Sequence, residues 1–224
     1  MINQILKKFV WSGVLLIGML GALILGGCDS ANSTSRAEES QSAKLLGMID
    51  ALEAMPQSTD SELLARFEGT QEQIDEARGL LMRSREVGYK LLSPMELKNE
   101  LDSYIIIATM PRGIYNLGLI PNARHFEFSI SPNVDESGKE VWALDAKSRP
   151  QEQFIRFLGE NKSAKILFYD EGEHVFAPVG SAHIALLWAK ALGYTNLYRL
   201  SGGLKAWKEL GIPLSTQAPS CCQM

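Results

Sequence analysis

Cysteine is nearly absent from this sequence. Its 224 residues contain three, Cys28, Cys221 and Cys222, and all of them lie towards the ends of the chain. Because no cysteine falls in the central stretch, a disulfide framework cannot support the folded region. The stability of that region has to come from the packing of a hydrophobic core.

Long runs of like charge are also missing. The 22 Lys and Arg residues stand against 26 Asp and Glu residues, which gives a net charge of -4. No block of positive charge is long enough to form a stripe for nucleic acid, so we expect no nucleic-acid partner. With 46% hydrophobic residues, the composition is that of a globular protein with room for one domain of about 100 to 150 residues and some appendages.

The one long apolar run lies at the N-terminus. Lys7 and Lys8 precede the apolar residues Phe9 to Leu25, and Gly26-Gly27-Cys28 follow. A basic start, an apolar stretch and small residues before a cleavage point are the three parts of an export signal. The apolar run is about 17 residues long, and a membrane-spanning helix needs about 20. Residues 1–27 are therefore predicted to be a signal peptide.

The end of this signal, Leu25-Gly-Gly-Cys28, resembles the bacterial lipobox, in which the cysteine is lipidated on its thiol and becomes the new N-terminus. The resemblance implies a lipid such as palmitate on Cys28 and a body anchored to a bacterial cell membrane, facing the periplasm or the cell exterior. Asp29, directly after that cysteine, implies retention at the inner membrane where enteric-type sorting applies. An uncleaved membrane anchor with an incidental Cys28 is the alternative.

Residues 28–43 are rich in Ser, Asn and Glu and have no apolar periodicity, which is typical of a flexible tether. Residues 44–87 have apolar residues at helical spacing. Two capping boxes in this stretch, Thr59-x-x-Glu62 and Thr70-x-x-Gln73, each predict the start of a helix, and Gly88 is predicted to end the last one. We interpret residues 44–87 as a helical spacer that packs on itself or on the next domain, with a partner-binding module as the alternative.

Residues 88–214 alternate between strand and helix patterns. Expected strands are Tyr89–Leu92, Tyr104–Ala108, Arg124–Phe128, Ile166–Tyr169 and Leu197–Leu200, and expected helices are one opened by Ser93, then Gln151–Leu158, Ser181–Leu192 and Leu204–Leu210. Two of the strands are continuous apolar runs, as in strands that are buried on both faces. The alternation predicts an α/β fold with a parallel sheet flanked by helices, preceded by a short helical segment. Residues 215–224 form a C-terminal tail.

A long motif closes the α/β region. Leu192 to Trp207 reads Leu-Gly-Tyr-Thr-Asn-Leu-Tyr-Arg-Leu-Ser-Gly-Gly-Leu-Lys-Ala-Trp, and Gly211-Ile-Pro213 follows. Physically, these residues are the end of a helix, an inner strand, a Gly-Gly turn and a helix that lays Trp207 on the sheet. In this order they resemble, nearly residue for residue, the closing motif of the rhodanese homology domain. The resemblance implies a rhodanese-like fold, whose active members transfer sulfur through a cysteine.

An earlier motif of the same family is matched in part. The family has an Asp-x-Arg turn, then an aromatic residue, then Gly-His-Ile-Pro-Gly-Ala, and this pattern aligns without gaps on residues 108–123. The positions that agree are Tyr115, Gly118, Ile120, Pro121 and Ala123; those that depart are Ala108, Met110, Leu119 and Asn122. The departures replace an acid, a base and an imidazole. The resemblance therefore implies that a polar network near the site has been lost.

The largest departure is at the end of the central strand. Active members place their nucleophilic cysteine there, and backbone N–H groups of the next loop lower its thiol pKa. Here Ile166–Tyr169 is followed by Asp170, and a carboxylate cannot carry a transferable sulfur. The loop to Ser181 has three acids and no arginine, so it would repel sulfur oxyanions. We predict an inactive domain without a cofactor, with these candidate binding residues: Asp170, Glu171, Gly172, Glu173, His174, Gly180 and Ser181.

Other interpretations of this loop stay open. Asp170 has the residue type of a helix or turn cap. The side chains of Asp170, Glu171, Glu173 and His174 are also of a type that could bind a divalent cation in a metal-dependent hydrolase, but they match no ordered metal-loop spacing, and we predict no metal. His125 and His183 have no Cys, Ser or metal partner in the sequence pattern, which favours structural roles for both.

Cys221 and Cys222 keep an enzyme open as an alternative. The eight residues from Pro213 to Cys221 reach at most about 26 to 29 Å when extended, so a tail thiol, or a thiol of a partner, could serve a sulfurtransferase. A frayed tail is the simpler interpretation. The sequence thus predicts a membrane-anchored envelope lipoprotein with a catalytically inactive rhodanese-like domain that acts as a binding or regulatory module, and an envelope protein is a candidate partner.

Overall fold

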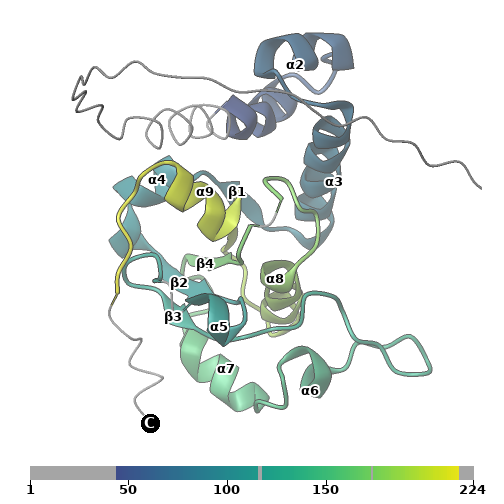
Figure 1. The fold of residues 1–224 in the computed structure, drawn as a ribbon. Coiled ribbons are helices and arrows are strands. Elements are labelled where there is room, and N and C mark those ends of the chain that lie inside the picture. Colours follow the sequence, from purple (N-terminus) through teal and green to yellow (C-terminus); the bar gives the residue numbers. More distant parts are fainter. Residues whose placement is uncertain (1–43, 116–117, 173, 217–224) are drawn as a thin grey trace, which may run out of the picture.

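A five-stranded sheet forms the centre of the molecule (Figure 1). The computed structural model describes residues 44–115, 118–172 and 174–216. The strands are β1 (Lys90–Leu92), β2 (Ile105–Ala108), β3 (Arg124–His125), β4 (Ile166–Tyr169) and β5 (Leu197–Leu200). Their order is β1-β5-β4-β2-β3, and all four pairings are parallel, which confirms the predicted sheet. Because β4 lies between β5 and β2, the carboxyl ends of these three strands meet at one edge.

Helices cover both faces of the sheet. They are α2 (Asp60–Phe67), α3 (Gln71–Val87), α4 (Pro94–Asn99), α5 (Arg112–Tyr115), α6 (Trp142–Asp145), α7 (Gln151–Leu158), α8 (Ser181–Ala191) and α9 (Gly203–Glu209), with a 3-10 turn at Leu101–Ser103 and a further helix over residues 44–54. The sequence analysis did not predict α5 and α6, each of which is a single turn of four residues.

The strand expected at Arg124–Phe128 is shorter than predicted. Only Arg124 and His125 pair regularly with β2, because β2 ends at Ala108. The chain still runs on beside the next residues: Phe126 N donates to Ala108 O, and Phe128 N donates to Thr109 O. The prediction was wrong in length because the partner strand, and not the propensity of these residues, sets how far the ladder extends.

Alternate residues of β4 face opposite layers of the core. Ile166 and Phe168 pack in a hydrophobic cluster with α7 and α8, whereas Leu167 and Tyr169 pack in a second cluster with α4 and α9. All four side chains are fully buried. This explains why the strand reads as an uninterrupted apolar run, since a strand covered on both faces has no solvent side.

The predicted helix boundaries are well supported at their N-termini. Side-chain and backbone bonds of a complete capping box are present at Thr59, Thr70 and Ser93, which open α2, α3 and α4. Gly88 ends α3 in the left-handed conformation, with φ 82°. These local signals are short-range, so they could be predicted without knowledge of the fold.

The N-terminal helices pack on each other and on the α/β domain, as predicted for residues 44–87. Figure 1 shows α2 and α3 at one end of the molecule, and α3 contacts both α8 and β1. The hydrophobic cluster of these helices also contains Phe176, which is fully buried and belongs to the loop after β4. The sequence analysis did not predict this contact, and it means that the helical segment helps to position that loop.

Across the residues that the structure describes, no helix is both long and apolar enough to span a bilayer. The predicted signal peptide (residues 1–27), the tether (28–43) and the tail from residue 217 onwards lie outside these residues. The predictions for Cys28, Cys221 and Cys222 therefore stay predictions.

Candidate functional site

The loop after β4 begins at Asp170, and the turn after β5 holds it in place. Leu204 N donates to Asp170 O over 2.9 Å, and Lys205 N donates to Glu171 O over 2.8 Å. Gly203 has φ 54°, and a Cβ at this position would lie 2.7 Å from Asp170 O. Because that distance is too short for a side chain, the glycine allows the two backbones to approach and fixes the start of the loop.

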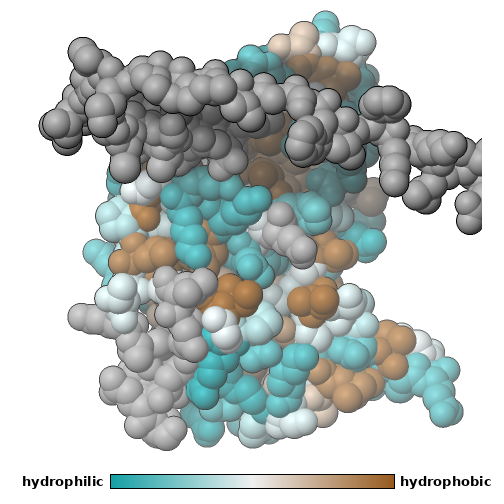
Figure 2. All heavy atoms as spheres, in the orientation of Figure 1, coloured by the Kyte–Doolittle hydropathy of each residue, from teal (hydrophilic) through white to brown (hydrophobic). Residues whose placement is uncertain are grey.

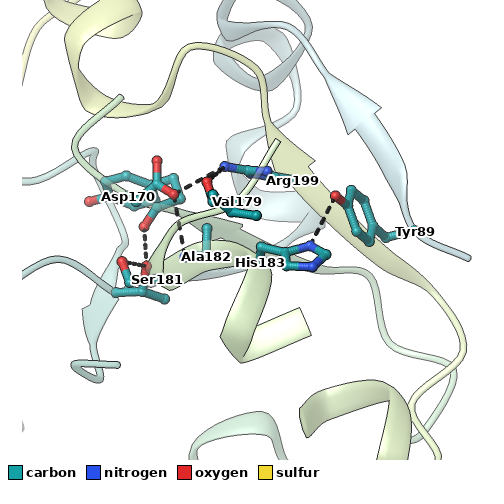
Figure 3. A network of polar contacts seen from close by, with 9 residues as sticks. Tyr89, Asp170, Val179, Ser181, Ala182, His183 and Arg199 are labelled. Carbon is teal, nitrogen blue, oxygen red and sulfur yellow. Dashed lines mark hydrogen bonds and ion pairs between the residues drawn. The ribbon is translucent and has the colours of Figure 1, made fainter. Parts of the chain in front are cut away.

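The carboxylate of Asp170 is held from two sides (Figure 3). Its Oδ2 lies 3.2 Å from Arg199 Nη2 and accepts a bond from the backbone N–H of Ala182, at 3.4 Å, in the first turn of α8. Gly180 precedes that turn with φ 127°, and a Cβ there would lie 2.7 Å from Oδ2. The geometry fits the predicted cap, because a negative charge is favoured at a helix N-terminus.

Arg199 is the site residue that the sequence analysis missed. Its side chain is 4% exposed. Besides the ion pair with Asp170, its Nη2 donates to Val179 O over 2.9 Å, and its Nη1 has no partner among the residues that the structure describes. The loop itself contains no arginine, but the neighbouring strand β5 supplies a guanidinium that pairs with its first acid. A charged residue inside an otherwise apolar strand was the available signal, because such a residue needs a buried counter-charge.

His183 and Tyr89 lie beside Arg199 (Figure 3). The Nδ1 atom of His183 is 3.4 Å from the hydroxyl oxygen of Tyr89. Burial and the positive charge of Arg199 lower the pKa of His183 to about 4. On β3, His125 Nε2 donates to Met110 O over 2.7 Å, and burial lowers the pKa of this histidine as well. Both imidazoles are buried and hydrogen-bonded, which is the arrangement of structural histidines.

A cavity of about 260 Å³ opens between this loop and the end of β2. Six of the seven candidate binding residues line it, namely Asp170, Glu171, Gly172, His174, Gly180 and Ser181. The seventh, Glu173, lies outside the described residues. Much of the remaining wall is apolar and was not predicted from the sequence: Met110, Pro111, Ile130, Ala177 and Val179. The loop and the end of β2 thus form one pocket at the carboxyl edge of the sheet, where open α/β folds bind ligands.

The metal interpretation gains no support from this geometry. In the described segments, no three side chains of His, Cys, Asp or Glu come close enough together to hold an ion.

Comparisons with known proteins place these observations in a family. The family model of the rhodanese-like domain matches residues 93–210, more than half of the chain. None of the curated proteins compared with the chain matches it.

Several solved structures are similar to parts of the chain. A rhodanese-related protein from Thermoplasma volcanium is 15% identical, with a TM-score of 0.39 and coverage of 58% of this chain and 100% of that one. A 3-mercaptopyruvate sulfotransferase from Escherichia coli is 23% identical, with a TM-score of 0.43, and the match covers 58% of this chain and 51% of that one. A 3-mercaptopyruvate sulfurtransferase from Leishmania major is 17% identical, with a TM-score of 0.37, and the match covers 59% of this chain and 38% of that one. On the family match, this chain belongs to the rhodanese-like domain family.

Proposed function

We propose that this protein is a membrane-anchored lipoprotein of the bacterial envelope whose rhodanese-like domain is a binding or regulatory module and does not transfer sulfur. One observation carries the proposal. The residue that directly follows the central strand β4 is Asp170, and its carboxylate is already paired with Arg199 and hydrogen-bonded to Ala182.

The chemistry of sulfur transfer supports this proposal. Transfer needs a thiolate that attacks the donor sulfur and then holds it as a persulfide, which is bound through a polarisable sulfur atom. Among the described residues that line the pocket, the one sulfur belongs to Met110, and a thioether has no proton to lose and cannot form a persulfide.

The form of the pocket supports a binding role. Two apolar side chains at its rim, Ile130 and Val179, are 68% and 43% exposed. Exposed apolar groups around a hollow with a few convergent polar atoms are typical of ligand and partner sites. Membrane attachment through Cys28 and the tether of residues 28–43 would hold this pocket near the bilayer surface, where an envelope protein could reach it.

A thiosulfate:cyanide assay on the purified protein tests inactivity. We expect no turnover above that of a variant in which both tail cysteines are replaced, Cys221→Ser with Cys222→Ser. Turnover that disappears in that variant would contradict the proposal and establish the alternative, a sulfurtransferase that uses a tail thiol.

Metabolic labelling with palmitate tests the anchor. We expect the protein to be labelled in a bacterial host and the Cys28→Ser variant to be unlabelled, because the thiol is the acceptor of the lipid. A Cys221→Ser variant is the matched control and should keep the label. An unlabelled wild-type protein that still fractionates with membranes would favour the uncleaved anchor.

A further inference from the structure

The N-terminal helices have a hydrophobic cluster that is separate from the two clusters of the α/β domain. Among the described residues, the buried side chains of this N-terminal cluster come from residues 44–87 with a single exception, Phe176, which belongs to the loop between β4 and α8. Phe176 is fully buried. On the face drawn in Figure 2, outside the grey atoms, apolar residues form small groups among hydrophilic ones, as expected where large apolar side chains are turned inwards. Phe176 thus completes the core of a segment to which its own loop does not belong.

A second contact places the same loop against α3. A Cβ added at Gly79, in the middle of α3, would lie 3.7 Å from the Cβ of Pro178, which is an ordinary van der Waals distance. The next residue of the helix, Leu80, lines a cavity of about 10 Å³ together with Val175 and Ala177 of the loop. Figure 1 shows the loop before α8 passing beside α3. The middle of α3 is therefore the surface on which this part of the loop rests.

The first helix, over residues 44–54, contacts the other turn at this edge of the sheet. A Cβ added at Gly202 would lie 3.6 Å from Leu46 Cδ2, so Leu46 packs close to the turn after β5. That turn donates the two backbone hydrogen bonds that hold Asp170 and Glu171. The helical segment is therefore in contact with both the loop after β4 and the turn that fixes the start of this loop.

The part of the loop that rests on the helices is also a wall of the pocket. His174, Ala177 and Val179 line the cavity of about 260 Å³, and they lie within three residues of Phe176 in the sequence. Because the backbone joins them, a displacement of Phe176 moves these neighbours with it. The shape of this wall therefore depends on whether Phe176 stays in the N-terminal cluster.

We propose that the N-terminal helices regulate the pocket, and that Phe176 is the residue through which the two are coupled. While the helices are docked, the loop is held in the shape described above. When they separate from the α/β domain, Phe176 loses its place and this wall of the pocket is released. Such coupling is reciprocal, so a ligand that binds the held form strengthens the docking of the helices. The inference rests on the proposed function, because it states how a binding or regulatory module is itself controlled.

Two matched helix caps provide a mild test. Thr70 opens α3 and Ser93 opens α4, each as the first residue of a complete capping box. Replacing either residue by Ala removes the same side-chain bond to the backbone of the third helical residue. The two helices differ in their surroundings, since α3 contacts the loop whereas α4 packs in the cluster that contains Trp207.

Hydrogen exchange of the full-length protein in neutral detergent, followed by mass spectrometry, measures the response of the loop. With Thr70→Ala, we expect the amides of residues 174–180 to exchange about fivefold faster, since loss of a cap favours opening of the helix by about this factor. With Ser93→Ala, these amides should keep the rate of the unmodified protein. An unchanged rate with Thr70→Ala would overturn the inference. Equal acceleration by both variants would also overturn it, because the loop would then open only with the whole domain.

The coupling should also act from the loop on the helices. Phe176→Ala should make the amides of α3 exchange at least about tenfold faster, while those of β2 and β4 stay slow. Val179→Ala is the control from the same loop, because Val179 is 43% exposed and is not part of the N-terminal cluster; it should leave α3 unchanged. Unchanged exchange of α3 in folded Phe176→Ala would contradict the coupling. If Phe176→Ala does not fold, Thr70→Ala decides the question, since it removes one bond at the surface.

The exchange measurements and the thiosulfate:cyanide assay fail independently. A loop that does not respond to Thr70→Ala, in a protein without turnover, refutes the regulation by the helices and leaves the proposed function standing. Cysteine-dependent turnover in a protein whose loop does respond refutes the proposed function and makes the same coupling a control on catalysis.

Discussion

Two turns meet at the carboxyl edge of the sheet, and they differ in how far they keep the pattern of the family. The turn after β5, with Gly202 and Gly203, resembles the family's closing motif nearly residue for residue. The loop after β4, from Asp170 to Ser181, carries three acids and opens with an aspartate, where the resemblance to active members implies a cysteine. Yet the first turn holds the second, through Leu204 N and Lys205 N.

This comparison distinguishes what the backbone of the loop needs for folding from what its side chains need for chemistry. The hydrogen bonds from the β5 turn to the loop run between backbone atoms, and the two backbones are so close at Gly203 that there is no room for a Cβ. Such contacts constrain the backbone of the loop but not its side chains, so they persist whichever residue stands at position 170. The side chains that face the pocket are free of this constraint, and there we expect the chemistry to differ from that of active members.

The largest expected effect is on the backbone contact itself. Gly203→Ala should lower the free energy of unfolding by about 3 to 4 kcal/mol. It puts a side chain on a residue in the left-handed conformation, and it forces the new Cβ to within 2.7 Å of Asp170 O and of Gly172 N. Gly193→Ala is the matched control. Gly193 also has a positive φ, 86°, but a Cβ added there would meet no atom within 4 Å, so the cost should be about 1 kcal/mol. Urea denaturation measures both, and equal losses would show that the close approach is unimportant.

The ion pair should respond unequally to the loss of its two members. Asp170→Asn leaves the guanidinium of Arg199, 4% exposed, without a counter-charge, and we expect a loss of about 2 to 3 kcal/mol. Arg199→Met leaves a carboxylate that still binds Ala182 N and is 16% exposed to water, so the loss should be about 1 kcal/mol. The double variant should lose less than the sum. A larger loss for Arg199→Met than for Asp170→Asn would contradict this order.

The same comparison explains what could be predicted from the sequence. Residues close together in the sequence determine several elements: the β5 turn, the buried runs of β2 and β4, and the capping boxes. The parallel sheet could therefore be predicted, and it is confirmed. The pairing of Asp170 with Arg199 joins residues 29 positions apart, and the burial of Phe176 under the N-terminal helices joins two segments that are distant in the sequence. Neither leaves a periodic signal in the sequence, because each depends on which strands become neighbours.

His183 should make the stability of the site depend on pH. Its folded pKa of about 4 lies below the unfolded value of about 6.5. Between these values the unfolded state binds the proton and the folded state does not. Stability is therefore highest above about pH 6.5 and falls as the pH is lowered towards 4.

The contribution of His183 between pH 7 and pH 5 should be about 1 to 2 kcal/mol. His183→Gln cannot take up the proton, so its urea stability should fall less over this range than that of the unmodified protein. His125, whose pKa is also lowered, remains in both proteins, as do the carboxylates, so the difference between the two slopes reports on His183 alone. Identical slopes would show that its imidazole is not held neutral.

The smallest expected change is in the acidity of an introduced thiol. Asp170→Cys, made with Cys221→Ser and Cys222→Ser, puts a sulfur at the end of β4, near the guanidinium of Arg199 and the first turn of α8. We expect its thiol pKa to fall from about 8.5 to about 7, measured as the midpoint of the pH dependence of alkylation by iodoacetamide. Adding Arg199→Met should move the midpoint most of the way back to the ordinary thiol pKa of about 8.5. A midpoint that does not move would mean that Arg199 does not act on position 170.

The same Asp170→Cys variant separates the effect of the residue at position 170 from the effect of the charge in the pocket wall. Alkylation at low pH without thiosulfate turnover would mean that restoring a thiolate is insufficient. Glu171, which lines the pocket, is a group that would oppose an anionic donor. Turnover with thiosulfate would mean instead that position 170 alone separates this domain from active members. We expect the first result, since the negative charge of Glu171 in the pocket wall would still oppose the binding of an oxyanion.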